Sequence, residues 1–180
     1  MSDRFDWDRA KGHIDNRQFW HIDEIKELPF TREEFNDPIQ LAKWKDNGLS
    51  PRVGMMYDMK HAYQPPTTDL LIKWAHMRDL RHIGISYYKM QPGDNLPYHS
   101  DTYARYIQLH NLDKKRDRIY RYLFFVEARL PGHIMEVDGH IVDWIAGDYV
   151  AWKYDTPHMA ANLGPYDRYT IQLTGVWGEN

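Results

Sequence analysis

Three His-x-Asp pairs stand out in the sequence, because an imidazole and a carboxylate two residues apart can bind one metal ion. They are His13-Ile14-Asp15, His21-Ile22-Asp23 and His99-Ser100-Asp101. The chain has 10 histidines among 180 residues. Such pairs are therefore expected by chance, and only their surroundings in the sequence can separate a metal site from a coincidence.

The surroundings favour the third pair. Side chains at positions i and i+2 share one face of a strand but lie about 200° apart on a helix. His99 and Asp101 follow a β-branched, aromatic run and a Pro92-Gly93 turn, which predicts an extended backbone. The pair His21-Ile22-Asp23 instead stands at an expected helix start, where Asp23 is the predicted N-cap. The pair at residues 13–15 lies in a polar segment without a strand pattern.

A third ligand must come from a histidine further along the chain. The downstream candidates are His110, His133, His140 and His158. The last of these differs from the others because a strand-like segment with Arg168 and Thr170 follows it ten and twelve residues later. A cation and a hydroxyl at this spacing could together bind a carboxylate.

The strand over residues 167–175 has two interpretations. Arg168, Thr170, Gln172 and Thr174 alternate with Tyr169, Ile171 and Leu173. Either the polar face meets solvent while the apolar face enters the core, or the polar face lines the interior of a barrel. The alternation alone favours the solvent-facing arrangement, and both remain open at this point.

The elements that must position these residues change character near residue 82. Helices are predicted at Pro38 to Asp46 and in PPTTDLLIKWAHMRDL, the latter capped by Thr67 or Thr68. Six or more short strands follow, including a hairpin around Asp138-Gly139. We therefore expect one mainly β domain over 1–180, with a mainly helical part (1–81) packed on an antiparallel sandwich or barrel (82–178).

Composition limits the classes of function. The net charge of -3 argues against a nucleic-acid partner. No cysteine is present, so a metal must bind through histidine, carboxylate, carbonyl or water, which favours iron, manganese, zinc or magnesium. No segment resembles a signal peptide or reaches transmembrane length, which predicts a cytoplasmic protein without a membrane partner.

The ordered set His99-x-Asp101, His158 and Arg168-x-Thr170 resembles the signature of the iron(II)- and 2-oxoglutarate-dependent oxygenases. The flanking segments YYKMQPGDNLPYHSD and WIAGDYVAWKYDTPHMAAN are also similar to those of the family. The end of the chain, with His158-Met159-Ala160-Ala161-Asn162 and Val176-Trp177, resembles aspartyl/asparaginyl hydroxylase-like members, and the chain also has some likeness to prolyl hydroxylase-like members. The aspartyl/asparaginyl hydroxylases, however, tend to lack the carboxylate ligand that Asp101 provides here.

The resemblance implies a double-stranded β-helix (jelly-roll, cupin-like) barrel buttressed by N-terminal helices. It implies that His99, Asp101 and His158 bind Fe(II), and that Arg168 and Thr170 bind 2-oxoglutarate. With O2, such enzymes hydroxylate an aliphatic carbon and release succinate and CO2. The expected substrate is an amino-acid side chain, free or in a peptide, or a small metabolite. The candidates for contacting it are Arg121, Tyr122, Asn162 and Tyr103.

Two other functions remain open from the sequence. A cupin-like isomerase or dioxygenase would use a metal without 2-oxoglutarate, and would not need Arg168 and Thr170 at this spacing. A non-catalytic jelly roll that binds a ligand would carry His99 and Asp101 as ordinary surface residues. Binding of iron(II) and of 2-oxoglutarate separates the three.

Overall fold

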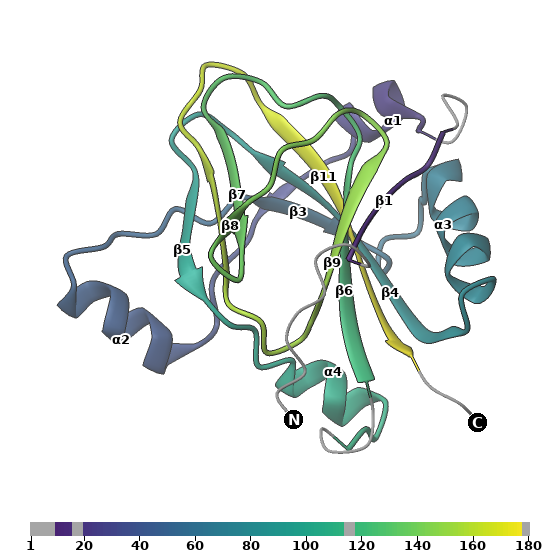
Figure 1. Cartoon of the computed structure of the whole chain (residues 1–180), viewed down its shortest axis with the longest axis horizontal. Coiled ribbons are helices and arrows are strands. Elements are labelled where there is room, and N and C mark those ends of the chain that lie inside the picture. Colours follow the sequence, from purple (N-terminus) through teal and green to yellow (C-terminus); the bar gives the residue numbers. More distant parts are fainter. Residues whose placement is uncertain (1–9, 16–19, 114–117, 178–180) are drawn as a thin grey trace.

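The computed structural model describes residues 10–15, 20–113 and 118–177, and within these residues the strands form two antiparallel sheets (Figure 1). The large sheet contains, in spatial order, β1 (Lys11–His13), β9 (Asp148–Lys153), β6 (Arg118–Phe125), β11 (Arg168–Trp177), β4 (Leu80–Met90), β3 (Met55–Asp58) and β2 (Thr31–Arg32). The small sheet contains β5 (Asn95–His99), β10 (His158–Asn162), β7 (His133–Val137) and β8 (His140–Ile141).

From β4 onward the chain passes back and forth between the two sheets, with the β7–β8 hairpin staying in the small one. Strands β4, β6, β9 and β11 lie in the large sheet, while β5, β7, β8 and β10 lie in the small one. Eight strands that wind in this way form the double-stranded β-helix, or jelly roll. The strand order thus confirms the fold class predicted from the sequence.

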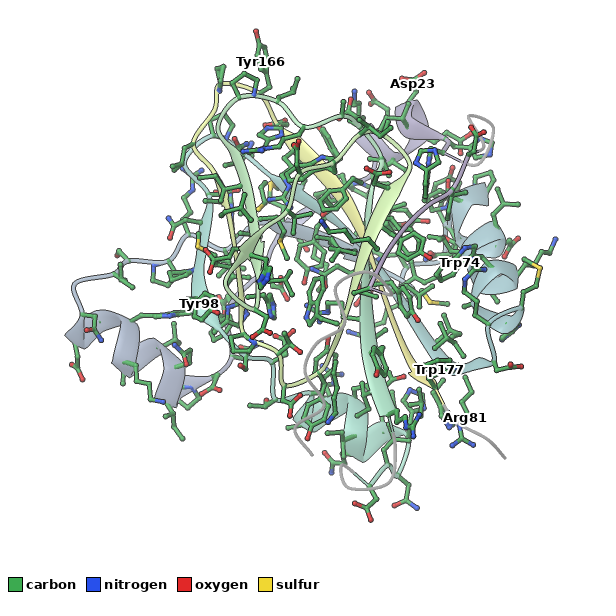
Figure 2. All side chains as sticks on the ribbon, in the orientation of Figure 1. Asp23, Trp74, Arg81, Tyr98, Tyr166 and Trp177 are labelled. Atoms are coloured by element: carbon green, nitrogen blue, oxygen red, sulfur yellow. The ribbon has the colours of Figure 1, made fainter. Side chains whose placement is uncertain are left out.

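Helices cover the outside of the barrel. α1 (Ile22–Lys26) and α3 (Pro66–His76) lie against the large sheet, α2 (Pro38–Asp46) lies beyond β5, and α4 (Ala104–Leu109) lies near the end of β6 (Figure 1). The buried stripe of α3 contains Leu71, Trp74 and Ala75. Trp74 packs edge-on against Tyr122 and Phe124 of β6, on the side of the helix that faces the sheet (Figure 2).

The local signals explain several element boundaries. Helix α2 begins with Pro38 after an Asp37 side chain that accepts hydrogen bonds from two backbone N–H groups, and ends before Asn47. The predicted hairpin forms between β7 and β8, with Asp138 at φ 50° and Gly139 at φ 78°. Positive φ at both central residues is the geometry that Asp-Gly favours in a tight hairpin turn.

Two predicted helix caps are wrong. The N-cap of α1 is His21, and Asp23 lies inside the first turn. The N-cap of α3 is Pro65, because Pro66 occupies the first helical position. The Thr68 hydroxyl instead lies 2.6 Å from Tyr87 Oη in a buried hydrogen bond. A tertiary partner thus outweighs the local capping preference.

The residues before β4 contribute strands as well as helices. β1, β2 and β3 extend the two edges of the large sheet. These strands have two to four residues, too few for an alternating pattern to show in the sequence. In the ranges that the structure describes, no helix is long and apolar enough to cross a membrane.

Candidate metal centre

The small sheet brings the two candidate histidines together. His99 is the last residue of β5 and His158 is the first residue of β10. These residues face each other in the antiparallel pairing of the two strands, with ring centroids 4.5 Å apart. Directly opposed residues share one face of a sheet, so both imidazoles enter the barrel at the same point.

Asp101 completes the cluster from the segment after β5. Its Oδ1 lies 3.6 Å from His99 Nε2, and its Oδ2 lies 3.6 Å from His158 Nε2. The donor atoms of the three residues all lie within 4.8 Å of one another. Among the described residues, this is the one cluster of three or more His or acidic side chains close enough to hold a metal ion.

Backbone hydrogen bonds orient both imidazoles. His99 Nδ1 lies 2.8 Å from the carbonyl oxygen of Pro97, and His158 Nδ1 lies 3.0 Å from that of Thr156. Because a carbonyl only accepts, each Nδ1 must carry the proton, and each Nε2 keeps its lone pair toward Asp101. Histidines that bind metals are held by outer hydrogen bonds of this kind, so the residues fit a metal ion.

The electrostatics also suit a cation. Burial lowers the pKa of His158 to about 4, although the Asp101 carboxylate acts in the opposite direction. Burial alone would raise the pKa of Asp101, but Arg121 and the two imidazoles hold it well below its usual range. Arg121 Nη1 lies 3.0 Å from Asp101 Oδ2. Neutral imidazoles and an ionised carboxylate are the forms that bind a metal.

The solvent-facing interpretation of the last strand is wrong. Arg168 and Thr170 are buried inside the barrel, with 4% and 6% of their surface exposed. Ile171 and Leu173 are buried on the opposite face, in the cluster that includes α3 residues. Both faces of β11 are covered because α1 and α3 pack on one of them and the small sheet closes over the other.

Arg168 retains unused hydrogen-bonding capacity in this interior. Its Nη1 donates to the Ile134 carbonyl at 2.8 Å, while its buried Nε has no hydrogen-bond partner among the described residues. Its guanidinium lies 5.1 Å from the centre of the Trp144 ring. Burial lowers the pKa of Arg168 to about 10, which still leaves it charged at neutral pH. A buried cationic donor of this kind calls for an anionic partner.

One pocket extends from the cluster toward the last strand. Of the three cluster residues, His158 lines it, together with Arg121, Arg168 and Thr170, while His99 and Asp101 line a wider neighbouring cavity. Apolar side chains, among them Leu123, Met135 and Trp152, fill the remaining wall. A ligand in this pocket could therefore reach the possible metal site with one end and the cation with the other.

Two of the four residues expected to contact a substrate lie elsewhere. Tyr122 points away from the barrel interior and packs against Trp74 at 5.3 Å between ring centroids. It alternates with Arg121 on β6, and Arg121 takes the interior side. Asn162 is fully buried, and its Nδ2 donates to the carbonyls of Met90 and Tyr166 at 2.8 Å. These contacts give Asn162 a structural role in holding the β10–β11 turn.

The other two expected residues lie beside the cluster. Arg121 pairs with Asp101, and the Tyr103 ring lies 5.0 Å from the Arg121 guanidinium. Both residues line a wider cavity that also contains His99 and Asp101. Their expected contact with a substrate stays a prediction.

The remaining His-x-Asp pairs do not form clusters. His13 Nδ1 pairs with Asp148 Oδ1 at 2.8 Å rather than with the aspartate two residues on. His21 Nδ1 lies 3.8 Å from Glu24 Oε1, at the helix start that its sequence predicted. His133 is buried, with Nε2 3.2 Å from the Tyr166 carbonyl, and His140 is exposed.

Sequence reasoning missed the segment 33–37, which approaches the cluster from the N-terminal part of the chain. Phe35 contacts the His99 ring edge-on at 5.2 Å and the Trp44 ring at 4.5 Å. Glu33 lines the same cavity as Asp101. No motif marks these residues, because their position depends on the loop between β2 and α2 folding back over the barrel.

The fold and this site together define a double-stranded β-helix protein with a His-Asp-His cluster suited to a metal ion. No family model matches the sequence, and the search of curated proteins found no similar one. Among solved structures, a prolyl-4-hydroxylase from Pseudomonas putida has a TM-score of 0.48 and 16% identity, over 87% of this chain and 97% of that one.

Two further solved structures are similar at a comparable level. A predicted oxalate decarboxylase from Thermotoga maritima has a TM-score of 0.45 and 14% identity, over 84% of this chain and 95% of its own. KdgF from a Halomonas species has a TM-score of 0.42 and 14% identity, over 86% of this chain and 91% of its own. With values this low, the fold assignment rests on the strand order, and function must be argued from the site.

Proposed function

We propose that this protein is an iron(II)- and 2-oxoglutarate-dependent oxygenase. The observation that supports the proposal is a pocket lined both by His158 of the metal cluster and by Arg168 and Thr170. His99, Asp101 and His158 offer two imidazole nitrogens and a carboxylate, the set typical of non-heme iron oxygenases. Arg168 and Thr170 lie further along the same pocket, where they suit the distal carboxylate of a dicarboxylate co-substrate.

The role of each residue follows from its position. His99, Asp101 and His158 would hold the iron, with their other hydrogen bonds already fixed by the backbone and Arg121. When bound, iron(II) with 2-oxoglutarate and O2 supplies the oxidation, which yields succinate, CO2 and a hydroxylated substrate carbon. The protein's contribution is to bind, orient and protect these groups.

Arg168 and Thr170 would recognise the co-substrate. The free Nε and the remaining guanidinium donors can bind a carboxylate, and the Thr170 hydroxyl can add a hydrogen bond. Both residues are more than nine-tenths buried. Because water has little access there, the ion pair is stronger than it would be at the surface. The apolar walls around it also keep water from the far end of the pocket.

A direct test measures succinate formation by purified protein with iron(II), ascorbate and 2-oxoglutarate, together with binding of 2-oxoglutarate to the metal-loaded protein. We expect slow succinate release even without a primary substrate. Alanine variants of His99, Asp101 and His158 should weaken metal binding by more than the roughly 10- to 100-fold that loss of an outer-shell partner costs. His21→Ala is the matched control and should bind metal normally.

The result also separates the competing functions. Metal binding without 2-oxoglutarate binding or succinate release would refute the oxygenase and favour a cupin-like enzyme that uses the metal alone. Absence of metal binding in the folded protein would favour a non-catalytic ligand-binding jelly roll.

A further inference from the structure

The cavity that contains His99 and Asp101 opens toward solvent between the segment 33–37, the loop after β3 and α4. A substrate of the proposed oxygenase would enter here, because Arg168 and Thr170 line the other pocket and not this cavity. The side chains of this entrance therefore indicate the substrate class, an inference that rests on the proposed function.

Glu33 is the carboxylate best placed to contact a substrate. It is partly buried on the cavity wall, and Tyr88 of β4 donates a hydrogen bond to its carboxylate. Burial raises the pKa of Glu33, while the Tyr88 hydrogen bond and the charge of Arg121 act in the opposite direction. Its own backbone N–H donates to the Gly54 carbonyl at 3.0 Å.

The loop that carries Glu33 is anchored on its N-terminal side. Arg32 Nη1 and Arg52 Nε lie 2.8 and 3.0 Å from Oδ1 of the fully buried Asp94. Arg32 also donates to the Val53 carbonyl at 2.8 Å. Because these contacts fix the chain next to Glu33, its carboxylate is held at the cavity before a substrate arrives.

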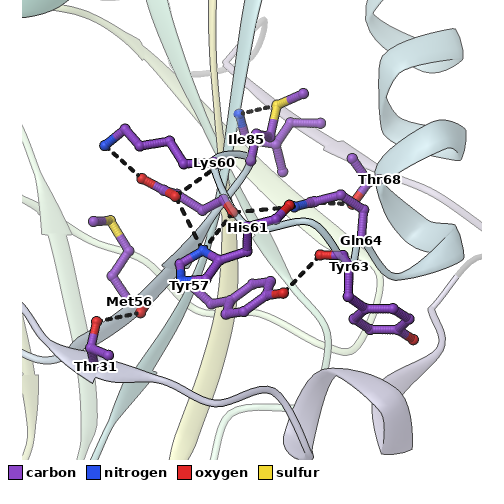
Figure 3. Close-up of polar contacts among 11 residues, drawn as sticks. Thr31, Met56, Tyr57, Lys60, His61, Tyr63, Gln64, Thr68 and Ile85 are labelled. Carbon is purple, nitrogen blue, oxygen red and sulfur yellow. Dashed lines mark hydrogen bonds and ion pairs between the residues drawn. The ribbon is translucent and has the colours of Figure 1, made fainter.

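Two of the cations that line this cavity are paired with other carboxylates, and a third, Arg105 of α4, is exposed. Arg121 pairs with Asp101 at 3.0 Å, and Lys60 Nζ pairs with Asp58 Oδ2 at 3.0 Å, one of the contacts drawn in Figure 3. Glu33 forms no ion pair with another described residue. The entrance thus has a half-buried carboxylate that forms no direct ion pair with a described residue.

Aromatic rings border the same space. Phe35, Tyr103 and Tyr106 all line the cavity. Ring faces attract cations, and they also pack against the methylene groups that carry a charged end group. A carboxylate beside aromatic rings suits an organic cation better than it suits an anionic or a purely apolar molecule.

We propose that the substrate carries a primary ammonium or guanidinium group that binds Glu33, so that the site accepts a basic amino-acid side chain or a similar amine. Bound in this way, the cationic end lies in the same cavity as His99 and Asp101. A carbon along the chain can then face the metal centre.

Equilibrium binding tests this proposal without turnover. Ligand-observed NMR would compare the N-acetyl amides of lysine and norleucine, and those of arginine and citrulline, with metal-free and Zn(II)-loaded protein. We expect each cation to bind at least about tenfold more tightly than its neutral counterpart, since hydrogen bonds to charged groups contribute on this scale. Glu33→Gln should abolish the preference, while Glu27→Gln, which removes an exposed charge outside the cavity, should retain it.

Equal binding of charged and neutral probes by the wild-type protein would overturn the proposal, and so would a folded Glu33→Gln protein that keeps the preference. The wild-type comparison needs no variant, so it decides the question even if Glu33→Gln does not fold. The assay needs neither O2 nor 2-oxoglutarate. A cation preference without any succinate formation would refute the oxygenase while leaving the cation site intact.

Discussion

The outer face of the large sheet is apolar and aromatic, whereas its inner face carries charged and hydroxyl side chains among apolar ones. On β11, Ile171 and Leu173 pack toward the helices, while Arg168 and Thr170 face the pocket. On β6, Phe124 lies on the outer face and Arg121 on the inner one. Neighbouring residues of one strand therefore lie in two different environments, the apolar core under the helices and the pocket inside the barrel.

The difference indicates how this small barrel separates stability from binding. The helix-covered face is filled by side chains that gain free energy by leaving water. The inner face instead buries polar groups that meet few partners, such as the Arg168 Nε. Buried polar groups without partners destabilise the fold. We therefore expect substitutions on the outer face to lower stability, and those on the inner face to lower ligand binding.

The largest expected effect is on the outer face. Trp74→Ala should lower the free energy of unfolding by about 3–5 kcal/mol, because it leaves a cavity between α3 and three aromatic rings of the sheet. Denaturant unfolding measures this loss. Protein that remains folded should bind metal and 2-oxoglutarate with wild-type affinity. A large change in those affinities would show that the two faces are coupled.

A substitution on the inner face should lower ligand binding and leave the stability of the fold intact. Arg168→Met should weaken 2-oxoglutarate binding by at least about a hundredfold, since a buried charged hydrogen-bonding partner is lost. Stability should stay the same or rise by about 1–2 kcal/mol, because the substitution removes a buried charge without a carboxylate partner. Calorimetric titration and denaturant unfolding measure the two quantities. A loss of stability beyond about 1 kcal/mol would mean that Arg168 supports the fold.

The smallest effects sharpen the comparison between adjacent residues. Thr170→Val removes one hydroxyl with little change in shape, and should weaken 2-oxoglutarate binding about fivefold, the value of an ordinary hydrogen bond. Ile171→Val is the matched control on the next residue. It should leave binding unchanged and lower stability by about 0.5–1.5 kcal/mol. If both variants altered binding alike, the division of β11 into two functional faces would be wrong.

Local patterns in the sequence were enough for much of the fold. Pro38 and Asn47 mark the ends of α2, and Asp138-Gly139 marks the β7–β8 turn. These signals act through neighbouring backbone groups, so they can be recognised without knowing the fold. Local patterns gave wrong predictions where a tertiary contact competed with them. The Thr68 hydroxyl, for example, forms a hydrogen bond with Tyr87 instead of capping α3.

The candidate site could be predicted in part. The order of His99, Asp101, His158, Arg168 and Thr170 along the chain resembles a known family signature, and that resemblance nominated them together. The structure brings the donor atoms of the first three within 4.8 Å of one another. The neighbours of these residues could not be predicted. The alternation of side chains along β6 does not show which of Arg121 and Tyr122 faces the interior. The structure decides this, because α3 packs on the side where Tyr122 lies and Arg121 lines the pocket.

The sequence by itself determined which residues have the chemistry to bind a metal and an anion, because residue type and spacing are written in it directly. Only the tertiary structure decided which face of β11 became the interior and which carboxylate stands at the entrance. Both outcomes depend on contacts between distant segments. The pairing of β5 with β10 joins His99 to His158, and the loop after β2 brings Glu33 beside Tyr88. Contacts between distant segments produce no periodic pattern in the sequence, so they cannot be predicted from it.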